Sequence, residues 1–117
     1  MSNNIIWTVD GKIKDGQKEA FDAVMKDLID ASRQEQGTMN YEWTIAEDQT
    51  SFHVHERYRD VESAMIHLGS FGKLAERFLE ASEITRFVVY SNITDDLQEA
   101  ITGLNPEYMK PFGGFTI

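Results

Sequence analysis

The 117-residue sequence contains no cysteine, only two prolines and few basic residues. The lack of cysteine excludes disulfide bonds, thiolate nucleophiles and cysteine-bound zinc or iron–sulfur clusters. Eleven Lys and Arg against 20 Asp and Glu give a formal net charge of −9, which repels nucleic-acid phosphates and anionic lipid surfaces alike. We therefore expect neither nucleic acid nor a membrane as a partner.

Long hydrophobic runs are also missing, so we expect no signal peptide and no membrane span, and we predict a cytoplasmic protein. Apolar residues still make up 41% of the chain, and seven Phe, four Tyr and two Trp are enough to build a core. No segment resembles an interdomain linker. We predict a single domain over residues 1–117, with a core over 5–93 and a C-terminal helix and extended arm over 94–117.

Four segments have the alternating pattern of β-strands, in which every second side chain is apolar or a β-former. They cover residues 5–13, 38–47, 51–59 and 83–93. The second and third are separated by a short polar turn, so residues 38–59 are typical of a hairpin.

Apolar residues spaced by three and four predict helices between these strands. The first helix is expected to run from a cap at Asp15–Gly16 to a C-cap at Gly37, and the second to start at Asp60 and bend at Gly69. Thr94 caps a last short helix before the extended tail. The order βαββαβ predicts an α+β fold of the ferredoxin-like kind with an antiparallel sheet.

Two helices cover only one face of a four-stranded sheet, and the other face is not purely polar. It would carry Ile6, Thr8, Thr44, His53 and His55, together with either Phe87 and Val89 or Val88 and Tyr90. Burying such a face against a second copy is worth on the order of 10 kcal/mol before association costs. We therefore predict a homodimer, with Phe112, Phe115 and Ile117 of the tail reaching across to the partner.

Glu56 and His67 are the polar residues most suited to chemistry. Glu56 has the register of Phe52, Val54 and Tyr58, so its carboxylate would lie among apolar neighbours. Such a group is either paired, for example with Arg86, or raised in pKa, which would make it a base near neutral pH. His67 lies at the edge of a helical apolar stripe, where it would face a cavity under the sheet or be a boundary histidine with a backbone partner.

His53 and His55 point to the same face of a strand, which is also the geometry of a metal-binding pair. A third ligand is not obvious, so structural or interface histidines are favoured and no metal is expected. Tyr41, Trp43 and Tyr58 would make aromatic walls for a flat ligand, but they would also suit a core. Phosphate-binding glycine loops and the motifs GxSxG and HExxH do not occur, so no nucleotide cofactor is expected.

Taken together, three segments resemble the antibiotic biosynthesis monooxygenase domain, including its quinol monooxygenase branch. They are residues 37–42, the run from Phe52 to Tyr58, and the run from Ala64 to Ser70. The family pattern is G-x3-Y followed by E-x-[YW]-x-[DN]-x3-A-x2-H-x2-S, and it is matched by Gly37, Tyr41, Glu56, Tyr58, Asp60, Ala64, His67 and Ser70. The resemblance covers about residues 5–93, and the closing Gly113-Gly114-Phe115 is similar to tails in part of the family.

The resemblance implies a dimeric α+β barrel with a pocket in each subunit, and a monooxygenase that needs neither metal nor flavin. Such chemistry is possible because a deprotonated phenol, hydroquinone or anthrone can itself pass an electron to O2. The residues it implies are His67 for proton transfer, Tyr58 and Glu56 to orient His67, and Trp43, Tyr41 and Phe71 to line the pocket. The alternative is a non-catalytic small-molecule-binding or regulatory dimer of the same fold. A haem-degrading relative is disfavoured, because that branch uses a Trp where this chain has Tyr58.

Overall fold

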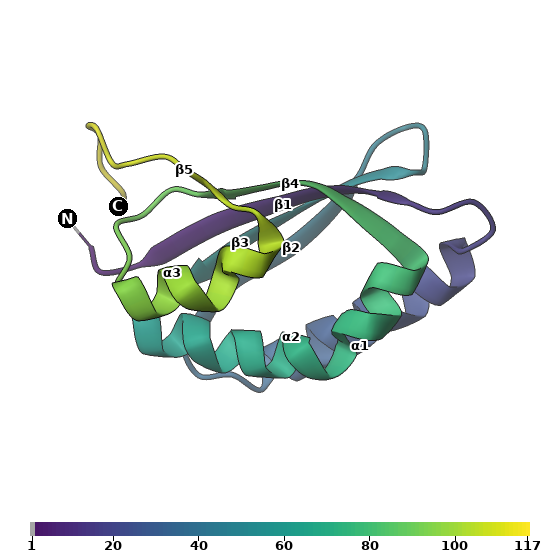
Figure 1. Cartoon of the computed structure of the whole chain (residues 1–117), viewed down its shortest axis with the longest axis horizontal. Coiled ribbons are helices and arrows are strands. Elements are labelled where there is room, and N and C mark those ends of the chain that lie inside the picture. Colours follow the sequence, from purple (N-terminus) through teal and green to yellow (C-terminus); the bar gives the residue numbers. More distant parts are fainter. Residues whose placement is uncertain (1) are drawn as a thin grey trace.

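Residues Ile5–Ile13 form β1, the central strand of a five-stranded sheet (Figure 1). The computed structural model describes residues 2–117. The strand order is β2–β3–β1–β4–β5, and all neighbours are antiparallel except the parallel pair β4 and β5. The other strands are β2 (Thr38–Ile45), β3 (Ser51–Tyr58), β4 (Ser82–Val89) and β5 (Glu107–Tyr108).

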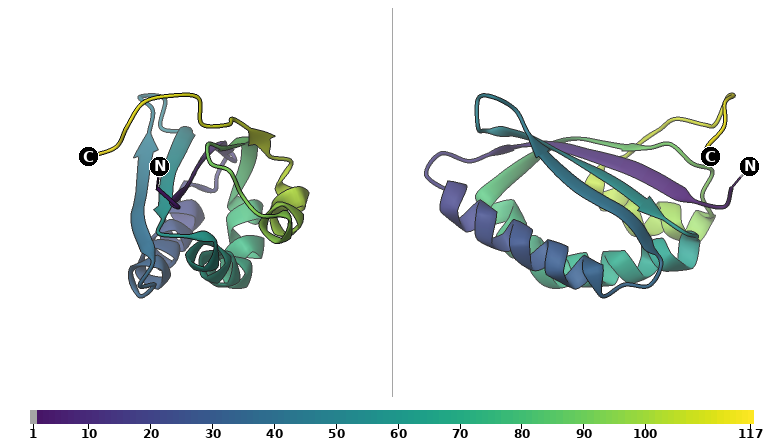
Figure 2. Two further views of the ribbon diagram at one scale, coloured as in Figure 1. Left: turned by 90° about the vertical axis from the view of Figure 1, so that its left-hand side faces the viewer. Right: turned by 180° about the vertical axis from the view of Figure 1, so that it is seen from behind.

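All helices lie on one face of this sheet, as the views from front and behind both show (Figures 1 and 2). They are α1 (Lys18–Arg33), α2 (Val61–Ala81) and α3 (Asp95–Ile101), which continues into the 3-10 helix η1 (Thr102–Leu104). The predicted βαββαβ order and the ferredoxin-like α+β class are confirmed. Within residues 2–117, this one-sided cover leaves the second face of the sheet without a helix.

The strand register decides which side chains face the helices. Trp7 pairs with Glu56 of β3 and with Val89 of β4, so these three side chains point the same way, into the core. Thr8 pairs with Val88, so Val88 and the following Tyr90 belong to the open face. Of the two alternatives for the last strand, Val88 and Tyr90 on the second face is therefore correct.

The predicted ends of the first helix were wrong. α1 begins after Gln17, which makes no capping hydrogen bond through its side chain, and it ends at Arg33 rather than near Gly37. Gly16 has φ +75°, so it serves the turn before the helix instead of capping it.

Two further boundaries also differ from the prediction. α2 runs without interruption through Gly69, because the cost of one helical glycine, about 1 kcal/mol, is smaller than the packing that holds a 21-residue helix on the sheet. β4 ends at Val89 instead of Ile93, and the tail contributes the unpredicted strand β5, which pairs with Val88 and Val89.

Gly37 is required by a close contact between the α1–β2 connection and the start of α2. A Cβ atom on Gly37 would lie 1.9 Å from Oγ and 2.4 Å from Cβ of Ser63. Ser63 cannot yield easily, because its backbone N–H (2.9 Å) and its hydroxyl (2.7 Å) both donate to Asp60, the N-cap of α2.

We therefore expect Gly37→Ala to lower the free energy of unfolding by about 2–3 kcal/mol, the cost of overpacking. Urea denaturation measures this, and Gly69→Ala is the matched control. A Cβ on Gly69 meets no atom within 4 Å, so that variant should be neutral or more stable, by up to ~1 kcal/mol. Equal stability of Gly37→Ala and wild type would contradict this explanation.

The C-terminal arm, residues 109–117, crosses the sheet on the side away from the helices (Figures 1 and 2). Three of its large apolar side chains, Phe112, Phe115 and Ile117, are 104%, 87% and 109% exposed. The arm is thus extended, as predicted, but these side chains do not dock on their own chain. Among residues 2–117, none of the helices has both the length and the apolar character needed to cross a membrane.

Candidate active site

A cavity lies between the sheet and α2, where the two halves of the core meet. The space inside it that a water-sized molecule can occupy is about 40 Å³. Its lining consists of Trp7, Val9, Tyr41, Trp43, Val54, Glu56, His67, Leu68, Phe71, Phe78, Ile84, Phe87 and Leu104. Five of the six predicted site residues are in this lining, and the sixth, Tyr58, lies behind it with 0% of its surface exposed. The surroundings are aromatic, and the polar groups are few and close together.

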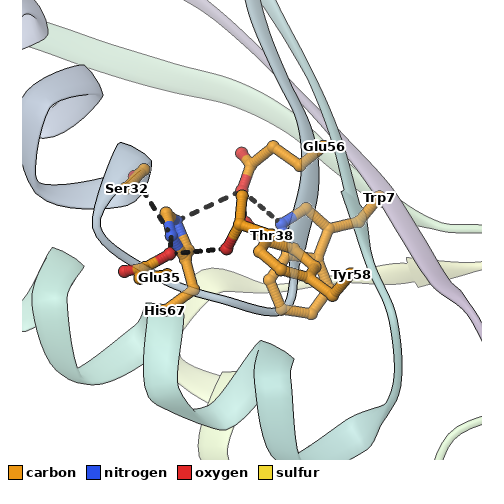
Figure 3. A network of polar contacts seen from close by, with 7 residues as sticks. All are labelled: Trp7, Ser32, Glu35, Thr38, Glu56, Tyr58 and His67. Carbon is orange, nitrogen blue, oxygen red and sulfur yellow. Dashed lines mark hydrogen bonds and ion pairs between the residues drawn. The ribbon is translucent and has the colours of Figure 1, made fainter.

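Glu56 projects from β3 into the cavity wall and is held through one of its two oxygens (Figure 3). Oε1 accepts hydrogen bonds from the Trp7 indole N–H at 2.8 Å and from the Tyr58 hydroxyl, and it lies 3.4 Å from His67 Nε2. No hydrogen bond from any of residues 2–117 reaches Oε2, which Figure 3 shows turned away from these contacts. Because Glu56 lines the cavity, Oε2 is the carboxylate atom left for a ligand.

Burial raises the pKa of Glu56 above its usual value of 4.5. The charge of His67 and the hydrogen bonds from Tyr58 and Trp7 favour the ionised form, but they do not fully compensate for the lost solvation. Both alternatives hold in part: burial raises the pKa of Glu56, and its carboxylate is also paired, with His67 and not with Arg86. Arg86 lies on the other face of the sheet, opposite Asp10, and donates instead to Glu107 at 3.1 and 3.2 Å.

His67 projects from α2 toward Glu56, and it is a buried residue with two carboxylate neighbours. Its Nδ1 lies 3.0 Å from Glu35 Oε1 and 3.4 Å from Ser32 Oγ, while its Nε2 faces Glu56. Only 3% of its surface is exposed. The prediction of a histidine facing a cavity fits this position, whereas a boundary histidine with a backbone partner does not.

Glu35 was missed by the sequence analysis. It lies between α1 and β2, where its Oε1 also accepts the Thr38 hydroxyl at 2.6 Å. Burial opposes ionisation, but the hydrogen bonds from His67 and Thr38 and the nearby charge of His67 contribute to a lowered pKa of Glu35. One signal was available, because an acidic residue just beyond a helix C-terminus is disfavoured by the helix dipole.

The two tyrosines of the site both keep their protons at ordinary pH. Burial, followed by the nearby charge of Glu56, raises the pKa of Tyr41 and that of Tyr58 well above 10. Their rings pack against the imidazole of His67 at centroid distances of 5.1 and 5.0 Å. Tyr58 therefore acts as a fixed hydrogen-bond donor to Glu56, and Tyr41 as an aromatic wall.

His53 and His55 lie on the open face of the sheet, away from this cavity. Their rings stack at 6.4 Å, and His53 Nδ1 lies 2.7 Å from Asp10 Oδ1. Over residues 2–117, His, Asp and Glu side chains form no group of three or more that could hold a metal ion. This arrangement fits a structural or interface pair.

Comparison with known proteins gives the chain a family. The family model described as "Antibiotic biosynthesis monooxygenase" matches residues 8–83, which is more than half of the chain. The chain belongs to the antibiotic biosynthesis monooxygenase family. No curated protein sequence gives a significant match.

Solved structures share this family's fold over most of the chain. MupZ from Pseudomonas fluorescens superimposes with a TM-score of 0.87 at 21% identity, over 100% of this chain and 91% of its own. SnoaB from Streptomyces nogalater, a cofactor-independent oxygenase, gives 0.67 at 11% identity, over 80% of this chain and 96% of its own. A conserved protein from Methanosarcina mazei gives a TM-score of 0.64 at 19% identity, over 74% of this chain and 90% of its own. At these identities the likeness concerns the fold.

The antibiotic biosynthesis monooxygenase motif has a physical meaning in this chain. Gly37 leaves room for Ser63 at the start of α2, and Asp60 caps that helix by accepting a hydrogen bond from the Ser63 N–H. These two contacts position α2 so that His67 meets Glu56. The motif therefore encodes the site and also the backbone contacts that hold it.

The raised pKa of Glu56 predicts a pH-dependent cost in stability. The pKa of Glu56 is higher in the folded chain than in the unfolded chain, so the stability that Glu56 contributes is fully present below pH 4.5. That stability is lost as the pH rises through the raised pKa. We expect Glu56→Gln, which is neutral throughout, to melt at a higher temperature than wild type at pH 8. Differential scanning calorimetry at pH 8 and pH 4 measures this. The gain should vanish at pH 4, and a lower melting temperature at pH 8 would contradict the pKa direction.

Proposed function

We propose that this protein is a cofactor-independent monooxygenase that oxidises a small electron-rich aromatic compound, such as a quinol, anthrone or phenol, with O2. The observation that carries the proposal is Oε2 of Glu56, a carboxylate oxygen in the wall of an aromatic cavity, without a hydrogen bond from residues 2–117. Membership of the family supports it, and so does the shared fold of SnoaB.

The proposed reaction needs a base and a dry, shaped cavity more than it needs a cofactor. Removal of a proton from the substrate makes an anion that can pass an electron to O2, and recombination of the two radicals forms the C–O bond. For an anthrone, the ring methylene group and one O2 become a carbonyl group and one water molecule, so the substrate supplies all four electrons. The protein's part is to accept the proton, orient the ring and exclude water.

Glu56 is the proton acceptor in this proposal, and His67 supports it. Both ring nitrogens of His67 face protein carboxylates, whereas Glu56 keeps one oxygen without a hydrogen-bond partner. This reverses the roles that the family resemblance implied, in which His67 transfers the proton and Glu56 orients it. Tyr58 keeps its implied role, because its hydroxyl fixes the Glu56 carboxylate.

Trp43 is the residue we propose for substrate orientation. Its indole Nε1 is buried and has no hydrogen-bond partner within residues 2–117, yet the ring lines the cavity. A carbonyl or ring oxygen of the substrate would satisfy this donor, while Tyr41 and Phe71 supply the remaining aromatic walls.

The test is oxygen consumption by the purified protein, followed with an oxygen electrode, with an anthrone and a hydroquinone as substrates. Uptake above the rate without protein, with one O2 used per molecule of oxidised anthrone, supports the proposal. Calorimetry with the same compounds distinguishes the alternative: tight binding without uptake would favour a non-catalytic binding or regulatory protein.

We also propose that the chain, as one domain over residues 1–117, forms a homodimer through the open face of its sheet. Apart from the arm, no element within residues 2–117 covers that face, on which Tyr90 is 37% exposed (Figure 2). The exposed apolar side chains of the arm support a second copy as the partner, because each would gain burial only against another molecule.

A further inference from the structure

His67 is enclosed between two carboxylates, and the proposed reaction uses only one of them. The side chains of His67 and Glu35 are 4% and 5% exposed, and that of Glu56 is 7% exposed. Figure 3 shows the imidazole ring between the two acids, with Nδ1 toward Glu35 and Nε2 toward Glu56. Placing a second buried carboxylate here costs solvation energy, so its presence calls for a role.

Glu35 lies against one ring nitrogen of His67, Nδ1. Its carboxylate is held by the Thr38 hydroxyl at 2.6 Å, and the 3.0 Å contact to Nδ1 requires a hydrogen between the two atoms. Because an ionised carboxylate only accepts hydrogen bonds, Nδ1 carries the proton in both charge states of the ring. Nε2, which faces Glu56, is then the nitrogen that gains or loses a proton.

We propose that Glu35 is a positioning residue: its charge holds His67 as an imidazolium against Glu56, which keeps Glu56 ionised and ready to accept a substrate proton. The substrate step rests on the proposed function, but the charge arrangement does not. The titratable groups around the ring are Glu35 from the α1–β2 connection, Tyr41 from β2, and Glu56 and Tyr58 from β3.

Glu35 can act on Glu56 in two ways that have opposite signs. As a nearby like charge, it makes protonation of Glu56 easier. Through His67, it stabilises a positive charge 3.4 Å from Glu56 Oε1, which makes protonation of Glu56 harder. His67 lies between the two acids, so its contact with Glu56 is the closer one, and we infer that the second effect dominates.

Carbon-13 NMR titration of the Glu56 carboxyl, assigned by its loss in Glu56→Gln, measures the sign directly. In Glu35→Gln we expect the midpoint of Glu56 to rise by about 1 pH unit, a tenfold gain in proton affinity. In a His67→Ala background the same change should lower the midpoint, because only the like charge is then removed. Glu80→Gln, an exposed carboxylate of α2, is the control and should leave the midpoint unchanged. A fall or no change for Glu35→Gln with His67 present overturns the proposal.

Nitrogen-15 NMR of the His67 ring in the unmodified chain gives a second readout that needs no variant. Protonated Nδ1 at every pH is expected, and a neutral ring protonated at Nε2 would overturn the proposal. Neither measurement depends on turnover. A protein with the expected titrations but no oxygen uptake would support this inference and contradict the proposed function. A protein that takes up oxygen, but in which Glu35→Gln lowers the Glu56 midpoint, would support the proposed function and contradict this inference.

Discussion

Glu56→Gln is expected to lower the rate of oxygen uptake by about 100-fold or more, the usual contribution of a general base. Glutamine has nearly the shape of glutamate, and its amide oxygen can still accept the Trp7 and Tyr58 hydrogen bonds that hold the side chain. The variant therefore removes the proton acceptor while keeping the packing. Initial rates with an anthrone at saturating oxygen measure the effect.

The exposed Glu80 supplies the control, since Glu80→Gln changes the net charge equally but lies outside the cavity lining. It should retain the wild-type rate. His67→Ala should also lower the rate, because Glu56 then loses the neighbouring charge that favours its ionised form. A Glu56→Gln protein with undiminished uptake would show that the substrate proton goes elsewhere.

The same base sets the pH dependence of the wild-type rate. Glu56 accepts a proton only when ionised, so activity should fall as the pH drops through its pKa. Burial raises that pKa above 4.5, so the acidic limb of the rate profile should lie above the position of an ordinary glutamate.

The second large effect is expected from the arm. Phe112→Ser, Phe115→Ser and Ile117→Ser together should convert a dimer into a monomer at micromolar concentration. Burying one such side chain is worth about 1.5–3 kcal/mol. The variant removes three of them from each of the two arms of the dimer, so the dissociation constant should rise at least ~1000-fold. Sedimentation velocity of both proteins measures the difference.

These residues are suitable because each already exposes nearly all of its surface, so serine there removes no contact within the subunit. The variant should therefore keep the unfolding cooperativity of the isolated domain. Wild-type protein that sediments as a monomer at the same concentration would rule out the dimer, and an unchanged dimer in the variant would rule out the arm as its support.

Local pattern was sufficient for the parts of this protein that depend on near neighbours in the chain. Alternation predicted β1 and β3 almost to the residue and placed Glu56 on the same face as Phe52 and Tyr58. Helical spacing placed His67 at the edge of the apolar stripe of α2, and facing a cavity was one of the two alternatives for it. Asp60 and Thr94 were predicted as helix caps, and both accept the expected backbone N–H. Each of these features is decided within a few residues, where side-chain direction follows from the backbone period.

Local pattern failed where a boundary depends on contacts from elsewhere. Gly37 was expected to end a helix, because a glycine after an apolar stripe is a common C-cap. It is instead a glycine because Ser63, 26 residues later, leaves no room for a Cβ atom. Gly69 was expected to interrupt α2, but the helix is continuous through this residue.

The sequence by itself determined the order of the elements, the inward face of each, and the presence of a carboxylate and an imidazole on facing elements. Only the tertiary structure decided their partners: Trp7 meets Glu56 through the β1–β3 register, Glu35 reaches His67 from a connection, and Arg86 points to the opposite face. The physical reason is that periodicity fixes the direction of a side chain relative to its own backbone. The group it meets depends on strand register and on the docking of helices that are distant in the chain.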